Sequence, residues 1–465
     1  MNKEKKIITC SSLLICIILV FVYCLSPLHI GINNGGQNTA IENSVGLSGI
    51  NDGQFYIKYN IIGVNESSSD TSFVNIVKPL IKLAGSFTNV FDIRILSFVY
   101  LILLLLSIFY FNKYVDLGNL RNNIIFAAIL IFVYFDLSYL VYINTLYAEA
   151  AFYVLFLLDI SLYIKLIKSQ KPQIPTTILF FLISVVICGL IKNMFLLFIP
   201  FAAMGIYLAV RRKGYMYRII VALLSLLLIV YPAVNYSNVG YETKDAFNSV
   251  FYGALYESSD PKADLNKLKI DEKYAELAGK NTYENLPQYV YEDEFKKEFF
   301  EKVSSKNFFK YYILNPKKFV SQYKFVGYNA FETYPKYAGN FTADSGKNAD
   351  VKAGGFKLYN LLKEKVFPKT LWFVYLIPLL VIALLVGYRK LINNTGIVIM
   401  GISVALSSII VFIIPMINNG LVDISRTMAV YNVTFDALVI MLVCILLHIT
   451  TKRKQEFKDK YGLSQ

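Results

Sequence analysis

Apolar positions in this chain are gathered into long blocks that short polar stretches separate. Ten blocks approach the roughly 20 apolar residues that an α-helix needs to cross the hydrocarbon core of a bilayer. They lie near 7–25, 93–112, 123–141, 147–167, 174–191, 193–210, 217–234, 370–388, 395–416 and 428–450. The pattern predicts an all-α, polytopic membrane protein with about ten transmembrane helices.

The short segments between the blocks alternate in charge, and this alternation predicts the orientation of the chain. The turns near 142–148, 192–193 and 415–427 contain few cations, whereas the other connections and the tail are basic. The basic residues are Lys113, Arg121, Lys165, Lys168, Lys171, Arg211, Arg212, Lys213, Arg218, Arg389, Lys390, Lys452, Arg453 and Lys454. Lys and Arg concentrate in cytoplasmic loops. We therefore expect a cell-membrane protein with both termini in the cytoplasm and an uncleaved first anchor.

Two segments, 26–92 and 235–369, are too polar to span a membrane and too long to be simple turns. The sequence thus divides into an N-terminal module of seven helices over 1–234, a large extracytoplasmic loop domain over 235–369, and C-terminal helices with a basic tail over 370–465. Within the loop domain, aromatic and aliphatic residues recur at helical spacing over 289–303 and 308–313. We expect amphipathic helices there that lie on the membrane surface or cap the bundle.

Composition narrows the chemistry that these loops can carry. Hydrophobic residues make up 56% of the chain, and the net charge of +14 reflects the cytoplasmic loops rather than nucleic-acid binding. All five cysteines fall inside apolar blocks, and the two histidines lie near opposite ends of the chain. Disulfides, a metal site and a Ser-His triad are therefore not expected. Acid–base chemistry must come from carboxylates.

Three acids of the extracytoplasmic side are candidate catalytic bases. Asp52 leads, because it precedes an aromatic run able to stack on a sugar, although an Asn-Asp-Gly turn with a solvated carboxylate explains it equally well. Glu149 opens an apolar helix, where it could also serve only to complement the helix dipole. Glu42 is the third. Inside the apolar blocks, Asp136 and Asp159 stand out, and we expect Asp159 to be protonated or hydrogen-bonded.

Cations of the same side are candidate phosphate ligands. Arg94, Lys192 and Arg426 are the candidates, with Arg426 preferred because a planar guanidinium can hold two phosphate oxygens. A snorkelling Lys192 and a surface ion pair between Asp423 and Arg426 are the simpler alternatives. Asp423, Lys58 and Tyr147 complete the set of candidate site residues.

Several short stretches, in order, give the chain a family resemblance over nearly its whole length. They are Asn33-Asn-Gly-Gly36, Tyr147-Ala-Glu149, Asn248-Ser-Val-Phe-Tyr-Gly-Ala-Leu255, Ser259-Asp-Pro261, Tyr334-Pro-Lys-Tyr-Ala-Gly-Asn340 and Gly420-Leu-Val-Asp-Ile-Ser-Arg426, with Asn432 and Asp436 behind. Together with an N-terminal anchor and two long outer loops, they resemble the GT-C glycosyltransferases. The likeness is greatest to hexose transferases of bacterial cell-surface and S-layer glycan synthesis.

This resemblance implies an inverting transfer from a polyprenyl-phosphate-linked sugar to a glycan or lipid-linked acceptor, with no further cofactor. A carboxylate would take the acceptor proton, and one or two cations would hold the departing phosphate. Such relatives carry an acid where this chain has Gly36 and a histidine where it has Thr427. Asp52 takes the role of the base by proximity alone.

Two other classes of protein remain open. One is a transporter or flippase of lipid-linked saccharides, although the chain has no evident paired repeats. The other is a non-catalytic protein of envelope glycan assembly, which the absence of an acid at Gly36 keeps open.

Overall fold

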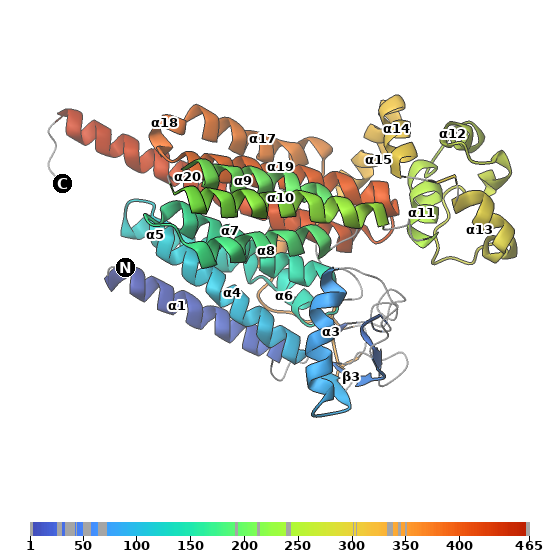
Figure 1. The fold of residues 1–465 in the computed structure, drawn as a ribbon, viewed down its shortest axis with the longest axis horizontal. Coiled ribbons are helices and arrows are strands. Elements are labelled where there is room, and N and C mark those ends of the chain that lie inside the picture. The colour runs from blue at the N-terminus through green and yellow to red at the C-terminus, as the bar shows by residue number, and fades with distance from the viewer. Residues whose placement is uncertain are drawn as a thin grey trace.

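Most of the chain is helical, and the helices form a long bundle with a smaller lobe at one end (Figure 1). The structure is a computed structural model that describes residues 3–25, 30–32, 42, 44–49, 57–63, 72–190, 194–211, 214–238, 243–300, 302–303, 305–332, 338–342, 346–348 and 351–461. Both chain termini lie at the end of the bundle opposite the lobe (Figure 1). We call the two ends of the bundle the lobe end and the terminal end.

The bundle is built from apolar helices that overlap the apolar blocks of the sequence. They are α1 (Lys3–Val20) continued by the π-helical turn η1 (Phe21–Leu25), α4 (Arg94–Tyr114), α5 (Leu120–Tyr134), α6 (Leu137–Ile143), α7 (Ala148–Lys168), α8 (Ile174–Leu190), α9 (Phe198–Arg211), α10 (Tyr215–Asn238), α17 (Leu371–Gly387), the short α18 (Arg389–Ile392), α19 (Thr395–Asn419) and α20 (Ile424–Tyr461). Among the described residues, five helices are long and apolar enough to cross a membrane, or seven if each of two bent pairs is one span. The chain is a multi-pass, α-helical membrane protein.

Helix α7 lies inside the bundle rather than at its surface. It is apolar on every side, and 89% of its most apolar window is buried, as expected for a helix that neighbours surround. Its neighbours include α4, α8 and α20. The acid within it, Asp159, accepts a hydrogen bond of 3.1 Å from the hydroxyl of Ser184 on α8. Because α7 is enclosed, its first turn, with Glu149, has a well-defined place at the lobe end.

The apolar block 123–141 forms two helices rather than the single helix expected. Helices α5 and α6 meet at an angle of 58°. Asp136 causes the break, since its carboxylate accepts a hydrogen bond of 3.0 Å from the backbone N–H of Ser138 and so caps the new helix. An aspartate in the N-cap position competes with continuation of the preceding helix.

Two small antiparallel sheets modify the all-α prediction. Strands β1 (Ile30–Ile32) and β5 (Ala338–Phe341) pair, and β3 (Lys58–Ile61) lies between β2 (Leu47–Gly49) and β4 (Val90–Asp92). Strands of three or four residues are too short for alternation of apolar and polar residues to reveal them. The β1–β5 pair brings the two long polar segments together.

The lobe contains the helices of the second polar segment up to residue 329 (Figure 1). It holds α11 (Thr243–Ser249), the π-helical turn η3 (Val250–Ala254), α12 (Pro261–Leu268), the 3₁₀ turns η4 (Glu272–Leu277) and η5 (Gln288–Tyr291), α13 (Asp293–Phe300), α14 (Ser305–Leu314) and α15 (Pro316–Asn329). Proline at the first position of α15 starts that helix without losing a hydrogen bond. Helix α3 (Ser72–Gly85), from the first polar segment, lies at the same end of the bundle (Figure 1).

Candidate functional site

Four of the candidate residues meet at the lobe end, where α7 and α20 begin. The Nε atom of Arg426 lies 3.3 Å from Glu149 Oε1 and 3.3 Å from Asp423 Oδ2. The guanidinium carbon of Arg426 also lies 4.9 Å from the centre of the Tyr147 ring, which is a cation–π distance. We call these four residues the Arg426 cluster.

A sharp turn between α19 and α20 places Asp423 and Arg426. Gly420 ends α19 with φ of +59°, and a Cβ atom there would lie 2.4 Å from the backbone oxygen of Asn248. Only glycine fits this close approach. Asp423 then adopts φ of +51°, which aspartate tolerates better than most residues, and its carbonyl accepts the backbone N–H of Arg426 at 3.1 Å. The turn therefore holds the carboxylate of Asp423 next to the guanidinium of Arg426 in the first turn of α20.

The lobe docks directly onto this turn. The backbone N–H of Leu421 donates to the carbonyl of Tyr252 at 3.0 Å, and the side chain of Asn248 donates to Asn419 Oδ1 at 2.9 Å. Gly253 permits the contact, since a Cβ atom there would lie 3.0 Å from Gly420 Cα. Two of the stretches that carry the family resemblance are thus in contact, and they border the Arg426 cluster.

The Arg426 cluster contains two carboxylates and one guanidinium at the border between the bundle and water. The side chains of Glu149, Asp423 and Arg426 are 10%, 15% and 13% exposed, so each is mostly screened from water yet not sealed from it. Burial raises the pKa of the Tyr147 hydroxyl, although Arg426 opposes the rise. Tyr147 therefore stays neutral, and its ring packs against the guanidinium of Arg426.

The chain matches one protein family, described as the YfdI N-terminal transmembrane domain, over residues 1–463. The chain belongs to this family. No curated protein and no solved structure matches the chain. Because the YfdI match covers both the bundle and the lobe, the Arg426 cluster and the contacts that border it all lie inside the family's domain.

Two other candidates, Lys58 and Arg94, form a second group at the three-stranded sheet. Arg94, at the start of α4, donates hydrogen bonds to the carboxylate of Asp92 through Nε and Nη2, and the shortest is 2.6 Å. Exposed Lys58 lies opposite Asp92 in the strand register. Ser97, one turn after Arg94, hydrogen-bonds Asn144 in the loop that leads to Tyr147 of the Arg426 cluster.

The remaining candidates have less structural definition. Glu42 is buried. Asp52 and Lys192 both lie outside the described residues. Their proposed roles, like those of the other site residues, stay predictions from the sequence.

A buried group of charges inside the bundle was not predicted as a site. Lys363 Nζ lies 3.0 Å from Asp436 Oδ2 on α20, and the side chains are 1% and 0% exposed. The hydroxyls of Tyr139 and Tyr359 also donate to the Asp436 carboxylate. We call these four residues the Asp436 cluster. An acid within an apolar block needs a partner, so Asp436 itself was a usable signal.

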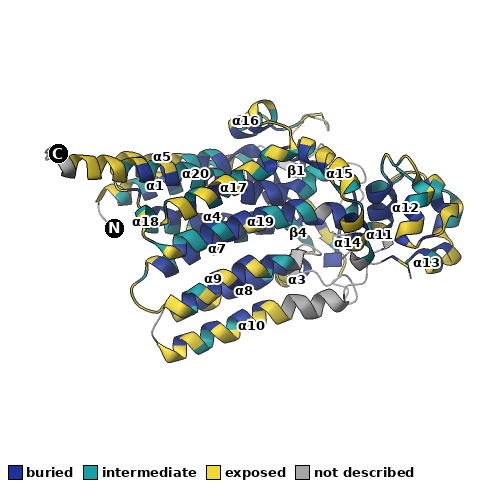
Figure 2. Cartoon of the chain, turned by 90° about the horizontal axis from the view of Figure 1, so that it is seen from above, coloured by how far each residue is buried: buried dark blue, intermediate teal, exposed yellow. Residues whose placement is uncertain are grey.

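Helix α16 (Leu358–Val366) supplies two members of the Asp436 cluster, and a second acid also holds this helix. Helix α16 meets α17 at 116°, and Figure 2 shows it beside the bundle with one buried side. The Asp136 carboxylate accepts the backbone N–H groups of Tyr359 at 3.0 Å and Asn360 at 3.3 Å. Asp136 therefore satisfies N–H groups that the start of a helix leaves without partners.

Proposed function

We propose that this chain is a membrane glycosyltransferase that moves a sugar from a polyprenyl-phosphate donor to a cell-envelope glycan acceptor on the extracytoplasmic side. The observation that carries the proposal is the Arg426 cluster. It combines carboxylates, a guanidinium and an aromatic ring in one partly exposed place, and the residues come from two helices far apart in the sequence. The GT-C resemblance predicts a carboxylate that takes the acceptor proton and a cation that holds the departing lipid phosphate.

The proposal includes ten spans with both termini in the cytoplasm. Both termini lie at one end of the bundle, and the basic connections near Lys165, Arg211 and Arg389 end helices at the side away from the lobe. The positive-inside rule assigns that end to the cytoplasm. The lobe and the Arg426 cluster would then face outwards.

The orientation is tested by labelling with a membrane-impermeant maleimide on intact cells. Ser259 in the lobe and Lys171 between α7 and α8 are both exposed, which makes them suitable cysteine positions. We expect Ser259→Cys to react from outside and Lys171→Cys to react only after lysis, with the unsubstituted chain as background. The reverse pattern would overturn the orientation and the proposed outer site.

In the proposed reaction, the acceptor hydroxyl attacks the anomeric carbon while the bond from that carbon to the lipid phosphate breaks. The carboxylate of Glu149 takes the hydroxyl proton, and the departing phosphate carries its negative charge to Arg426. Asp423, in the turn just before α20, orients the guanidinium of Arg426 from three residues away. We favour Glu149 over Asp423 as the base because it comes from a separate helix, and a ligand can therefore enter between it and α20.

Asp52 stays the candidate base that the sequence favoured, and the experiment must separate it from Glu149. Membranes that contain the chain would be supplied with radiolabelled polyprenyl-phosphate hexose and a cell-envelope acceptor fraction. We expect label to move into the acceptor with the wild-type chain and not with Arg426→Ala, while Arg389→Ala, a cation of the terminal end, serves as the matched control.

The same assay distinguishes the rival functions. Label that crosses the membrane while still attached to its lipid would favour a transporter. A lack of both transfer and transport in membranes with folded protein would favour a non-catalytic assembly role.

A further inference from the structure

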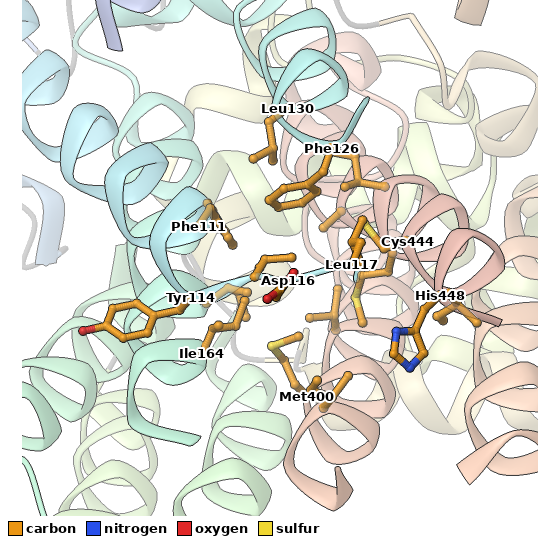
Figure 3. A pocket seen from close by; sticks show the side chains of 18 of the residues that line it. Phe111, Tyr114, Asp116, Leu117, Phe126, Leu130, Ile164, Met400, Cys444 and His448 are labelled. Carbon is orange, nitrogen blue, oxygen red and sulfur yellow. The ribbon is translucent and has the colours of Figure 1, made fainter. Parts of the chain in front are cut away.

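A cavity of about 180 Å³ lies between α4, α5, α7, α19 and α20 (Figure 3). Its lining includes Asp116, Lys168 and His448, which place it towards the terminal end and away from the Arg426 cluster. Side chains of these helices converge on it, as the labelled Phe111, Phe126, Met400 and Cys444 show. Protein interiors contain few voids larger than a water molecule. An apolar cavity of about 150 Å³ stays dry and binds small hydrocarbons. The cavity is thus large enough to hold part of an apolar chain.

The length of the cavity matches the thickness of one leaflet. Along α20 its wall extends from Ala437 to His448, which is about 16 Å at 1.5 Å per residue. Along α7 it extends from Phe156 to Lys168, about 18 Å. Half of the roughly 30 Å hydrocarbon core is about 15 Å. The cavity therefore has the depth to accept an acyl chain that enters from the nearer membrane surface.

The polar residues of the cavity gather at its terminal end. Asp116, Lys168 and His448 lie there, and the side chain of Asp116 is 58% exposed, so this end opens to water. Lys5 pairs with Asp116 at 3.3 Å and, like Arg211, interacts electrostatically with Lys168.

Among the described residues that line this mouth, Asp116 is the one acid, and its ion pair with Lys5 offsets its charge. Lys168 also lines the mouth, and the positive charges of Arg211 and Lys452 act on Lys168 and His448 respectively. A basic pocket between transmembrane helices on the cytoplasmic side has the chemistry to hold an anionic lipid headgroup.

We propose that this cavity binds an anionic phospholipid of the cytoplasmic leaflet, with one acyl chain between the helices and the headgroup phosphate beside Lys168 and His448. The inference uses the orientation proposed above and does not depend on sugar transfer. A polyprenyl-phosphate donor is a poorer occupant, because its phosphate would lie at the end of the bundle opposite Arg426.

The test is native mass spectrometry of the full chain in detergent, titrated with phosphatidylglycerol or with phosphatidylcholine of the same acyl chains. We expect one phosphatidylglycerol to bind more tightly than phosphatidylcholine. Lys168→Ala should weaken the affinity for phosphatidylglycerol about fivefold, which corresponds to about 1 kcal/mol for one cation near an anionic headgroup. Exposed Lys171, in the same connection but outside the cavity wall, provides the matched control Lys171→Ala, which should bind normally.

A cavity-filling variant tests the acyl-chain part of the proposal. Ala437→Leu narrows the cavity within the membrane and should weaken binding of both phospholipids. If this variant does not fold, the comparison between Lys168→Ala and Lys171→Ala still decides. Equal binding of the two phospholipids, or equal effects of the two lysine variants, would overturn the proposal. Displacement of phosphatidylglycerol by stoichiometric polyprenyl phosphate would instead assign the cavity to the isoprenoid lipid.

Discussion

The Arg426 cluster and the Asp436 cluster both use α20, about 15 Å apart along the helix, yet they satisfy their charges differently. In the Asp436 cluster, one carboxylate receives one ammonium group and two tyrosine hydroxyls, and its charged side chains are at most 1% exposed. In the Arg426 cluster, two carboxylates share one Nε atom, and the three charged side chains are 10% to 15% exposed.

The difference separates a site that can exchange partners from one that cannot. A ligand at the Asp436 cluster would have to break several buried hydrogen bonds, and that cost is large in a low-dielectric interior. At the Arg426 cluster, an incoming phosphate could replace a carboxylate on the guanidinium and leave that carboxylate able to accept a proton. We therefore propose that the Arg426 cluster carries the chemistry and that the Asp436 cluster anchors α16.

Glu149→Gln should have the largest effect of the variants that distinguish the two clusters. The variant keeps the size of the side chain and loses the proton acceptor, so sugar transfer per folded molecule should fall by roughly 10² to 10⁴. Binding of the donor lipid should survive. Asp52→Asn and Glu42→Gln are measured in the same membranes. Loss of transfer in Asp52→Asn, with normal transfer in Glu149→Gln, would move the base to Asp52.

Substitutions in the Asp436 cluster should lower the stability of the fold rather than change the rate of sugar transfer directly. Asp436→Asn leaves Lys363 as an uncompensated buried charge and should lower the free energy of unfolding by about 3 to 5 kcal/mol. The double variant Lys363→Met with Asp436→Leu removes both charges and should recover much of this loss. Denaturant unfolding in mild detergent measures both. A stable Asp436→Asn chain without transfer would mean that this cluster takes part in the reaction.

A smaller effect is expected in the lobe, where Asp264 on α12 joins α15. Its carboxylate accepts hydrogen bonds from Lys318 at 2.7 Å and Ser258 at 2.6 Å. Burial alone would raise the pKa of Asp264, but these hydrogen bonds hold the pKa below its usual value. We expect Asp264→Asn to lower the free energy of unfolding by roughly 1 to 2 kcal/mol at neutral pH.

The pH dependence of this effect follows from the direction of the pKa shift. The folded pKa of Asp264 lies below the unfolded value of about 3.9, so the carboxylate stabilises the fold above that pH. As pH falls through the folded pKa, this stabilisation is lost. Thermal unfolding of wild type and Asp264→Asn should therefore converge in acid, and a constant difference in stability down to pH 3 would contradict the assignment.

The membrane class and helical fold could be predicted from the sequence because block length and hydropathy are enough to place a helix in a bilayer. The break at Asp136 had a readable cause, an aspartate in the N-cap position. The pairing of strands 30–32 and 338–341 could not be predicted, since strands of three or four residues are too short to show an alternation of apolar and polar residues.

The candidate site was predictable in its members but not in its contacts. Tyr147, Glu149, Asp423 and Arg426 were each chosen because topology placed them on one side of the membrane. That α7 and α20 are neighbours depends on helix packing, which hydropathy does not encode. Lys363 was not predicted as a site residue because the sequence around it reads as an ordinary amphipathic helix. Its burial depends on α16 folding back against the bundle.

The proposal that Arg426 holds the departing phosphate is tested most directly by comparing Arg426→Lys with Arg426→Ala in the sugar-transfer assay. Protein level and thermal unfolding are measured on the same membranes. Lysine keeps the charge but not the planar fork that can hold two phosphate oxygens. We expect both variants to fold and both to lose roughly 10² to 10³ in the rate of sugar transfer, the loss typical of removing one transition-state donor. Near-normal transfer by the lysine variant would show that Arg426 is only a structural charge between α7 and α20.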